Sequence, residues 1–378
     1  MYQCVRRASN DVSWGVRDNI HTNERREFSV FEAQAASSGG GNLGSIVRAR
    51  FNHGYEHIIS LENLLLAWQE FLSGKKMRKD VLEFERNLMG NIIAFHQTLD
   101  ARAYKHSPYQ AFNISDPKPR NIHKAAVKDR LLHHALYRQL YPFFDRTFIA
   151  DSYSCRLNKG THKAVERFHA FSRKVSRNDT RTVWVLKCDI RKFFASVDQE
   201  TLLYIVRRYI PDKDIVSVLS EIVSSFHSTQ KGRGLPLGNL TSQLLVNIYM
   251  NEFDQFVKHA LKVKYYIRYA DDFVFLSDDK QCLEDILPKI SRFLKEKLKL
   301  LLHPDKVFIK TLASGVDFLG WVHFPDHRVI RTVTKRRMYK RITEMEGKEE
   351  TVQSYLGLLS HGNTAKIKNV VLGYLGRE

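Results

Sequence analysis

Two adjacent acids inside a short apolar stretch constrain this chain more than any other feature. The stretch covers residues 265–277 and reads YYIRYADDFVFLS, so strand-forming side chains lie on both sides of Asp271 and Asp272. This pattern predicts two strands joined by a tight turn, with both carboxylates at its tip. Neighbouring carboxylates repel each other, and a bound divalent cation is the usual way in which that repulsion is relieved. The alternative is an acidic turn at the surface, which many proteins have.

A third acid ends another strand. Residues 181–190 read RTVWVLKCDI, a run rich in β-branched and aromatic residues that predicts a buried strand ending at Asp189. If this strand pairs beside the hairpin, all three acids meet at one edge of a sheet. Phosphoryl transfer with two metals needs such a group, because one ion activates the attacking hydroxyl and the other neutralises the leaving pyrophosphate. Oxygen ligands favour two Mg²⁺ ions, with Mn²⁺ as a substitute.

The chain carries an excess of positive charge. Its 378 residues include 60 Lys and Arg against 41 Asp and Glu, which gives a formal net charge of +19. That balance favours a polyanionic partner such as nucleic acid, and the alternative is a generically basic soluble protein. No apolar run approaches the roughly 18 residues of a membrane span, and no secretory signal opens the chain, so we expect a cytoplasmic protein without membrane contact. The cysteines form no C-x-x-C pair, which argues against a disulfide framework and a zinc knuckle.

The remaining pattern mixes helices and strands without regular alternation. Ser60 is a candidate cap for a helix whose apolar face runs from Leu61 to Phe71. Apolar periodicity predicts further helices in the last fifty residues and over residues 80–99, 125–145, 198–209, 241–261 and 281–299. Strand patterns cover residues 109–114, 300–309 and 318–324. This order disfavours a doubly wound parallel sheet and predicts an α+β fold.

Around the acids the sequence resembles a known family, the reverse transcriptases. Residues 269–272, YADD, resemble the Y-x-D-D box of that family, and residues 189–194, DIRKFF, resemble its D-I-x-x-F-F strand. Further likenesses are a fingers motif, an S-x-x-x-R segment and the primer grip, at residues 119–120, 152–156 with 160–161, and 318–321. The resemblance runs from about Leu61 to the carboxyl end.

This resemblance implies a right-hand polymerase fold, with fingers, a palm of antiparallel sheet backed by helices, and a short helical thumb. A leader with a flexible linker is expected before the fingers, because residues 33–41 read AQAASSGGG. No endonuclease, ribonuclease H or maturase extension is expected after the thumb. The expected divisions are the leader at 1–45, the N-terminal region and fingers at 46–180, the palm with residual fingers elements at 181–325, and the thumb at 326–378.

The same resemblance implies an activity and a site. The activity is RNA-directed DNA polymerisation by two-metal nucleotidyl transfer. Asp189, Asp271 and Asp272 would be catalytic and would bind the metals, with Ile190 as a further metal-binding position. The implied nucleotide-binding positions are Lys118, Arg120, Phe194, Leu237, Gly238, Gln243 and Lys306. The implied primer grip consists of Phe318, Leu319, Gly320 and Trp321.

Individual roles follow from the likeness. Phe194 falls where the family keeps an aromatic ring against the sugar, which excludes a 2′-hydroxyl. Lys118 and Arg120 would meet the triphosphate, and Lys306 would assist the departure of pyrophosphate. The alternatives are that Phe193 and Phe194 both belong to the core and that Lys118 or Arg120 is a solvated surface charge. Candidate contacts to the nucleic-acid backbone near the carboxyl end are Arg336, Arg337, Lys340, Arg341, Lys366 and Lys368.

One loop discriminates within the family. Most members carry Q-G-x-x-x-S-P, whereas residues 237–243 read LGNLTSQ, with Leu237 in the Gln position and Gln243 in the Pro position. This double change is similar to the reverse transcriptases of diversity-generating retroelements, which copy RNA with frequent errors opposite adenines before the cDNA replaces a variable region, a process called mutagenic retrohoming. Leucine in place of an amide removes a polar check on the nucleotide pair. The alternative is that Leu237 only packs.

The resemblance also implies partners, and it leaves two alternative functions. The partners would be template RNA, a primer with its cDNA, dNTPs and a small basic helical accessory protein. One rival is an antiphage-defence or retron-like reverse transcriptase, which keeps the chemistry. Another, from a different class, is a non-catalytic basic RNA-binding scaffold with a polymerase fold.

Overall fold

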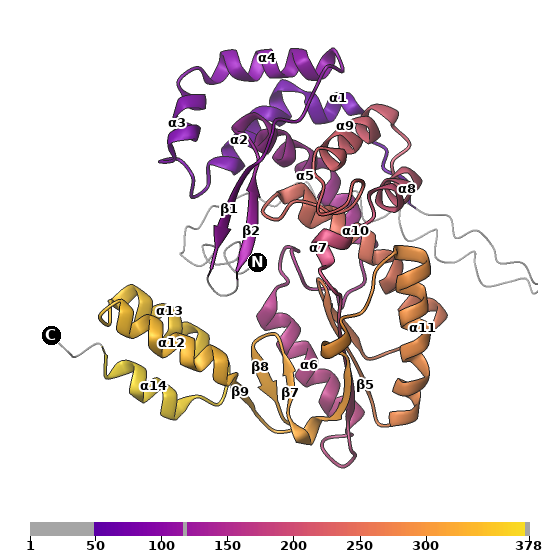
Figure 1. The fold of residues 1–378 in the computed structure, drawn as a ribbon, viewed down its shortest axis with the longest axis vertical. Coiled ribbons are helices and arrows are strands. Elements are labelled where there is room, and N and C mark those ends of the chain that lie inside the picture. The colour runs from indigo at the N-terminus through magenta and orange to yellow at the C-terminus, as the bar shows by residue number, and fades with distance from the viewer. Residues whose placement is uncertain (1–48, 116–118, 375–378) are drawn as a thin grey trace, which may run out of the picture. The chain divides into compact units, whose positions relative to one another are not determined.

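Four antiparallel strands form the main sheet, in the order β4-β5-β3-β6. The computed structural model describes residues 49–115 and 119–374 (Figure 1), so the expectations for the leader and for Lys118 lie outside the described residues. The hairpin predicted around the paired acids is confirmed, and the predicted strand that ends at Asp189 pairs beside it. The strands are β3 (Trp184–Asp189), β4 (Tyr266–Tyr269), β5 (Asp272–Ser277) and β6 (Phe308–Thr311).

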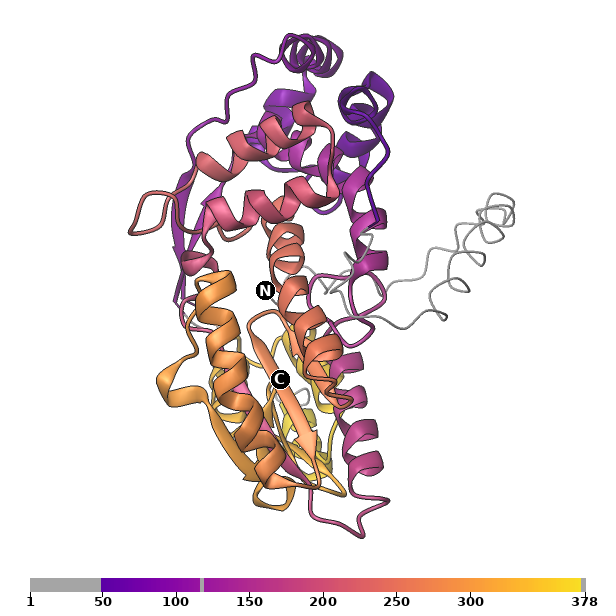
Figure 2. The same ribbon diagram turned by 90° about the vertical axis from the view of Figure 1, so that its right-hand side faces the viewer.

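Helices cover both faces of this sheet. Alternate side chains of β5 point to opposite faces, so that Phe273 and Phe275 join one core cluster and Val274 and Leu276 join another. The first cluster contains the apolar faces of α10 and α11, and the second contains that of α6. In Figure 2 the orange α11 lies in front of the sheet. These helices are α6 (Thr161–Val175), α10 (Leu240–Gln255) with a π-helical end (Phe256–Ala260), and α11 (Lys280–Leu298).

The N-terminal part is helical apart from one hairpin. Ser60 caps α2 as predicted, because its Oγ accepts a hydrogen bond of 3.2 Å from the backbone N–H of Asn63. The α5 helix packs against both α2 and α10 and so joins this part to the sheet. The elements are α1 (Tyr55–Ile59), α2 (Leu61–Leu72), α3 (Lys79–Glu85), α4 (Leu88–Asp100), β1 (Gln110–Ile114), β2 (Arg120–Lys124) and α5 (Val127–Thr147). Three helices follow β3: α7 (Phe193–Ser196), α8 (Gln199–Tyr209) and α9 (Lys213–Ser224).

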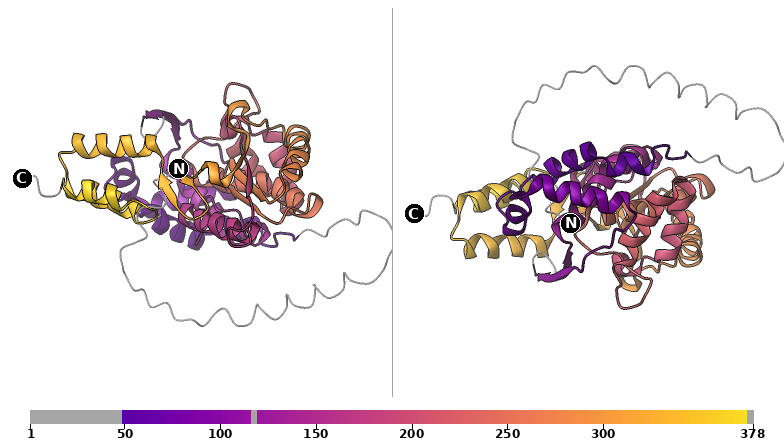
Figure 3. Two further views of the ribbon diagram at one scale, coloured as in Figure 1. Left: turned by 90° about the horizontal axis from the view of Figure 1, so that it is seen from below. Right: turned by 90° about the horizontal axis from the view of Figure 1, so that it is seen from above.

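The carboxyl end forms a small sheet followed by helices. Strands β7, β8 and β9 form an antiparallel meander. The described part of the last fifty residues is mainly helical, as predicted, and both views of Figure 3 keep its yellow helices together. The elements are β7 (Val316–Phe318), β8 (Trp321–His323), β9 (Arg328–Ile330), α12 (Thr332–Glu344), α13 (Glu349–Leu359) and α14 (Ala365–Leu372).

Several predicted elements were wrong in extent. The single helix predicted over residues 80–99 is instead two helices, α3 and α4. The chain breaks between them because Asn87 has φ −127° and ψ 49°, which is not helical. The strand predicted over 300–309 is limited to β6, and a 3₁₀ turn at Pro304–Lys306 precedes it. The strand predicted over 318–324 is a tight hairpin of β7 and β8, because Leu319 and Gly320 have φ of 51° and 92°.

The fold class is the predicted one. Antiparallel sheets combined with helices make an α+β arrangement, and no parallel sheet is found in the part of the chain that the structure describes. Several elements were not predicted: the strands β2 and β9, the longer helices α6 and α9, and the short helices α1 and α7. None of the helices in the described ranges is long and apolar enough to cross a membrane.

Candidate active site

Three acids lie together at one end of the main sheet. The antiparallel register of β3 and β5 sets Asp189 directly opposite Asp272. Asp271 stands in the turn between β4 and β5, and its carbonyl accepts a hydrogen bond of 3.2 Å from the N–H of Ile190. Ala270, before it, has φ 57°, the left-handed conformation that makes this turn tight. The backbone thus brings together the acids that the sequence predicts to converge.

A lysine faces each of two acids. Lys306 Nζ lies 3.0 Å from Asp189 Oδ1, because the chain before Lys306 runs along the end of β3, where the N–H of His303 donates 2.8 Å to the carbonyl of Asp189. Lys187 Nζ lies 3.4 Å from Asp272 Oδ2. The other oxygen of this carboxylate, Oδ1, is buried and has no hydrogen-bond partner. A buried oxygen without a donor is costly unless something positive binds it.

The two turn acids have raised pKa values. Burial, reinforced by the charge of Asp189, raises the pKa of Asp271 to about 6. Burial raises the pKa of Asp272 to about 7, although Lys187 opposes this shift and the other two acids add to it. Both carboxylates are therefore harder to ionise than ordinary aspartates, and a bound cation would reverse the effect.

The donor set suits a hard divalent cation. Within residues 49–115 and 119–374, no group of three or more His, Cys, Asp or Glu side chains already stands in metal-binding geometry. The oxygens of Asp189, Asp271 and Asp272 are nevertheless the ligand type that Mg²⁺ and Mn²⁺ prefer, and the unpartnered Asp272 Oδ1 is an acceptor that the protein itself does not satisfy. These residues fit the metal that the sequence predicts.

Replacing Asp271 by asparagine should stabilise the metal-free protein at high pH. The pKa of Asp271 in the folded chain, about 6, exceeds its ordinary value of 3.8, so folding favours the protonated form. The contribution of Asp271 to the free energy of unfolding is therefore fully present below about pH 4, where the carboxyl is protonated, and is lost as the pH rises through about 6. We expect Asp271→Asn to exceed wild type by about 1–2 kcal/mol in free energy of unfolding at pH 8, and by much less at pH 4.5. Urea unfolding in EDTA measures both values.

Asp278→Asn is the control for this prediction. Asp278 pairs with Arg181 at the surface, and its side chain is 46% exposed, so the substitution should change the free energy of unfolding only slightly at either pH. A difference between Asp271→Asn and wild type that stays constant from pH 4.5 to pH 8 would contradict the prediction.

The loop before α10 lies against the N-terminal hairpin. The carbonyl of Leu237 accepts a hydrogen bond of 3.2 Å from the N–H of His123 on β2. Gly238 has φ 107°, and a Cβ at this position would lie 3.1 Å from Ile122 Cγ2, so the turn favours glycine. The hydroxyl of Thr241 lies 2.6 Å from His133 Nδ1 in the buried start of α10. The LGNLTSQ loop is therefore hydrogen-bonded to the strand that begins with Arg120.

The family model for "Reverse transcriptase (RNA-dependent DNA polymerase)" matches residues 113–323. This span holds the main sheet, all three acids and the loop before α10. The chain belongs to the reverse transcriptase family. The match confirms the predicted family and leaves the retroelement subtype open.

The chain is also similar to curated proteins and, weakly, to solved structures. Protein YkfC of Escherichia coli K12 is 28% identical over 262 residues, covering 60% of this chain and 66% of YkfC. The group II intron-encoded protein LtrA of Lactococcus lactis is 22% identical over 368 residues, covering 77% of this chain and 59% of LtrA. The chain thus spans about two thirds or less of these relatives. A Candida tropicalis apo telomerase has a TM-score of 0.45 at 13% identity, covering 62% of this chain and 59% of the telomerase.

Other positions implied by the reverse transcriptase likeness are spread over several elements. Phe193 is buried in the core, whereas its neighbour Phe194 is only half-buried on α7. Gln243 lies in the first turn of α10. The primer-grip residues form the turn between β7 and β8, where Phe318 and Trp321 are buried. Leu319 is buried in the same core cluster and Gly320 is half-buried, so most of this segment packs into the protein.

Sequence reasoning missed two charged residues next to the acids. Lys187 lies in the interior of β3 and faces Asp272, and Arg268 lies inside β4 with no exposed surface. The signal was present in both cases, since a charged residue inside an apolar strand needs a buried partner. The S-x-x-x-R segment also proves structural: the guanidinium of Arg156 bonds the Asp145 carboxylate and the carbonyls of Ile149, Ser152 and Asp145.

Proposed function

We propose that this chain is an RNA-directed DNA polymerase that makes cDNA from an RNA template. A primer 3′-hydroxyl would attack the α-phosphate of a dNTP, with pyrophosphate as the leaving group. The observation that carries the proposal is the meeting of Asp189, Asp271 and Asp272 at one sheet end, in a chain of the reverse transcriptase family. Two Mg²⁺ ions, or Mn²⁺ in their place, would supply Lewis acidity and charge neutralisation at this point.

Each residue near the acids has a proposed task. The three carboxylates and the backbone of Ile190 would hold the metals. Lys306, now paired with Asp189, would be free to meet the leaving phosphates once that carboxylate binds a cation. The proposed nucleotide pocket consists of Lys118, Arg120, Phe194, Leu237, Gly238 and Gln243. The primer grip at residues 318–321 would hold the primer end, within a fingers, palm and thumb division at 46–180, 181–325 and 326–378.

Primer extension tests the activity. A DNA primer annealed to an RNA template, supplied with labelled dNTP and Mg²⁺, should be extended by the wild-type chain and not by the variant that lacks both turn acids. The rival is a non-catalytic basic RNA-binding scaffold. That rival gives no reason for three acids to converge at one end of a sheet in a protein whose net charge is +19.

We further propose that this polymerase belongs to a diversity-generating retroelement. The supporting observation is the LGNLTSQ loop, in which the carbonyl of Leu237 bonds β2 and the apolar Leu237 side chain is half-buried. A small basic helical accessory protein would then assist, and the cDNA would replace a variable region of a target gene. A defence or retron-like enzyme is the rival, and neighbouring genes distinguish the two, since a repeated template region accompanies the retroelement.

The loop makes a prediction about fidelity. We expect Leu237→Gln to lower misincorporation opposite template adenine by about tenfold, because the amide restores a polar check on the nucleotide pair. Errors opposite the other three bases should change little. Sequencing of cDNA made from a fixed RNA measures all four rates. Leu237→Met, which keeps the site apolar, should retain the wild-type errors, and equal wild-type error rates at all four template bases would remove the claim.

A further inference from the structure

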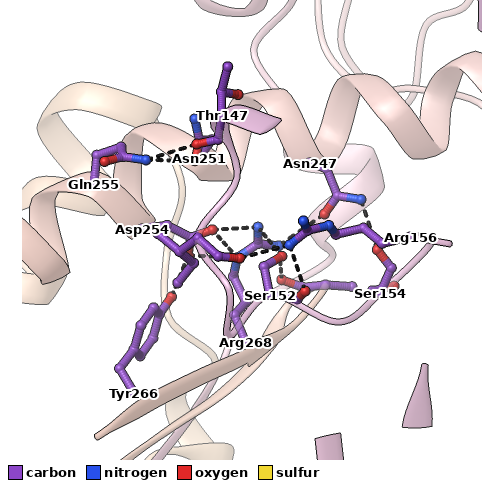
Figure 4. A network of polar contacts seen from close by, with 12 residues as sticks. Thr147, Ser152, Ser154, Arg156, Asn247, Asn251, Asp254, Gln255, Tyr266 and Arg268 are labelled. Atoms are coloured by element: carbon purple, nitrogen blue, oxygen red, sulfur yellow. Dashed lines mark hydrogen bonds and ion pairs between the residues drawn. The ribbon is translucent and has the colours of Figure 1, made fainter. Parts of the chain in front are cut away.

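A fully buried ion pair lies directly behind the acidic turn. Arg268 of β4 and Asp254 of α10 are both 0% exposed, with Arg268 Nη2 2.7 Å from Asp254 Oδ2 and Nε 2.8 Å from Oδ1. The hydroxyl of Tyr266 donates a further hydrogen bond of 2.7 Å to Asp254. Figure 4 shows these side chains converging between the helix and the hairpin.

Every N–H donor of the Arg268 guanidinium has a partner. A guanidinium carries five such donors, one on Nε and two on each terminal nitrogen. Nε and Nη2 bond Asp254, and Nη2 also donates 3.0 Å to the hydroxyl of Ser152. Nη1 donates 3.3 Å to Asn247 Oδ1 and 3.2 Å to the carbonyl of Ala270. The last contact reaches the residue that precedes the first turn acid.

The Ala270 contact bears on the geometry of the turn. With φ 57°, Ala270 adopts a left-handed conformation that is unfavourable for a residue with a Cβ, so surrounding contacts must hold it. Its carbonyl belongs to the peptide that leads into Asp271. A guanidinium fixed on this oxygen therefore limits how far the peptide, and the two carboxylates after it, can rotate.

The pair also ties the hairpin to two other segments. The backbone N–H of Arg268 donates 3.0 Å to the carbonyl of Asp151, and the N–H of Tyr153 donates 3.0 Å to the carbonyl of Arg268. Asn247, which accepts from the guanidinium, donates 2.9 Å to the carbonyl of Ser154. Arg268 thus connects α10, residues 151–154 and the acidic turn.

Stability alone does not explain such a pair. Apolar side chains of similar volume often replace a buried ion pair without loss of stability, because two charges must be desolvated when it forms. What apolar side chains cannot supply is a directed donor to the Ala270 carbonyl. The arrangement therefore points to a role in holding the geometry of the turn at Ala270.

We propose that Arg268, held in place by Asp254, is a positioning residue that fixes the Ala270 carbonyl and thereby the orientation of Asp271 and Asp272. This inference rests on the proposed function, because those two acids matter only if the chain is a polymerase. Arg268 itself touches no reacting atom and acts through the turn.

Two variants separate positioning from packing. Arg268→Lys keeps the charge but cannot bond Asp254, Ser152 and the Ala270 carbonyl together. Tyr266→Phe is the matched control, since it removes a hydrogen bond to the same Asp254 without touching the turn. Hydrogen–deuterium exchange of the peptide spanning residues 268–273, in EDTA, reports on the turn without metal or substrate. Single-nucleotide extension gives kcat and the KM for dNTP.

We expect Arg268→Lys to exchange about tenfold faster in this peptide and to lose about 30-fold in kcat, with KM within about threefold of wild type. The Mg²⁺ concentration for half-maximal rate should rise. Tyr266→Phe should leave all of these values near those of wild type. If Arg268→Lys does not fold, the triple variant Arg268→Met, Asp254→Leu, Tyr266→Phe, which replaces the cluster by apolar side chains, should fold and show the same losses.

Unchanged turn exchange in a folded Arg268→Lys or triple variant would overturn the inference. Equal losses in Tyr266→Phe would overturn it too, because they would reflect the cluster as a whole. A wild-type protein that never extends a primer would refute the proposed function instead. The exchange measurement would then still decide whether Arg268 fixes the turn.

Discussion

The double variant Asp271→Asn, Asp272→Asn should extend a primer on RNA at least about 1,000-fold more slowly than wild type. Each substitution keeps the size of the side chain and removes the charge that would hold a divalent cation. The loss should be large because the two metals would activate the attacking hydroxyl and neutralise the leaving pyrophosphate at this one point. Incorporation of labelled dNTP over time, at equal protein concentrations, measures the ratio. Circular dichroism checks that the variant is folded.

The chain contains its own control for this variant. A second Asp-Asp pair, Asp278 and Asp279, follows the other end of β5. Asp279 caps α11 by accepting 2.9 Å from the N–H of Gln281, a role that asparagine fills equally well. Asp278→Asn, Asp279→Asn should therefore retain wild-type extension. Equal incorporation by wild type and by the Asp271, Asp272 variant would favour the non-catalytic scaffold.

The hairpin was predictable because its signal is local. Strand-forming residues on both sides of two turn-tip acids leave one reasonable structure, and the strand ending at Asp189 is equally self-contained. Pairing of the two also followed, since a buried strand needs neighbours. The break at Asn87 was missed because the apolar spacing continues across it, from Phe84 to Leu88, and periodicity cannot detect one non-helical residue.

Contacts between distant residues were not predictable in the same way. Lys187 and Asp272 are far apart in the chain, as are Ser152 and Arg268, so no local pattern pairs them. Charged residues inside strands are usually assigned to a solvated face, whereas here burial forces each to find a specific partner. The sequence could indicate that Arg268 needs an acid, and only the fold could identify Asp254 as that acid.

The structure gives Phe194 a place beside the discriminating loop. Its backbone carbonyl accepts a hydrogen bond of 2.8 Å from the N–H of Leu235, two residues before Leu237. Its ring is half-buried and lies 5.6 Å, centre to centre, from that of the buried Phe193. Phe193 therefore supports the neighbouring ring from the core, and Phe194 offers a partly exposed aromatic face at the proposed nucleotide pocket.

From this placement we expect Phe194→Ala to incorporate ribonucleotides about 100-fold more readily, relative to dNTPs, than wild type. Removing the ring opens space for a 2′-hydroxyl while leaving the metal-binding acids unchanged, so dNTP incorporation should persist. Phe194→Tyr keeps the ring and should keep the wild-type preference. Competition between rNTP and dNTP in single-nucleotide extension measures the ratio. An unchanged ratio in a stable Phe194→Ala protein would assign this ring to the core alone, because a ring that only packs affects folding and not the choice of sugar.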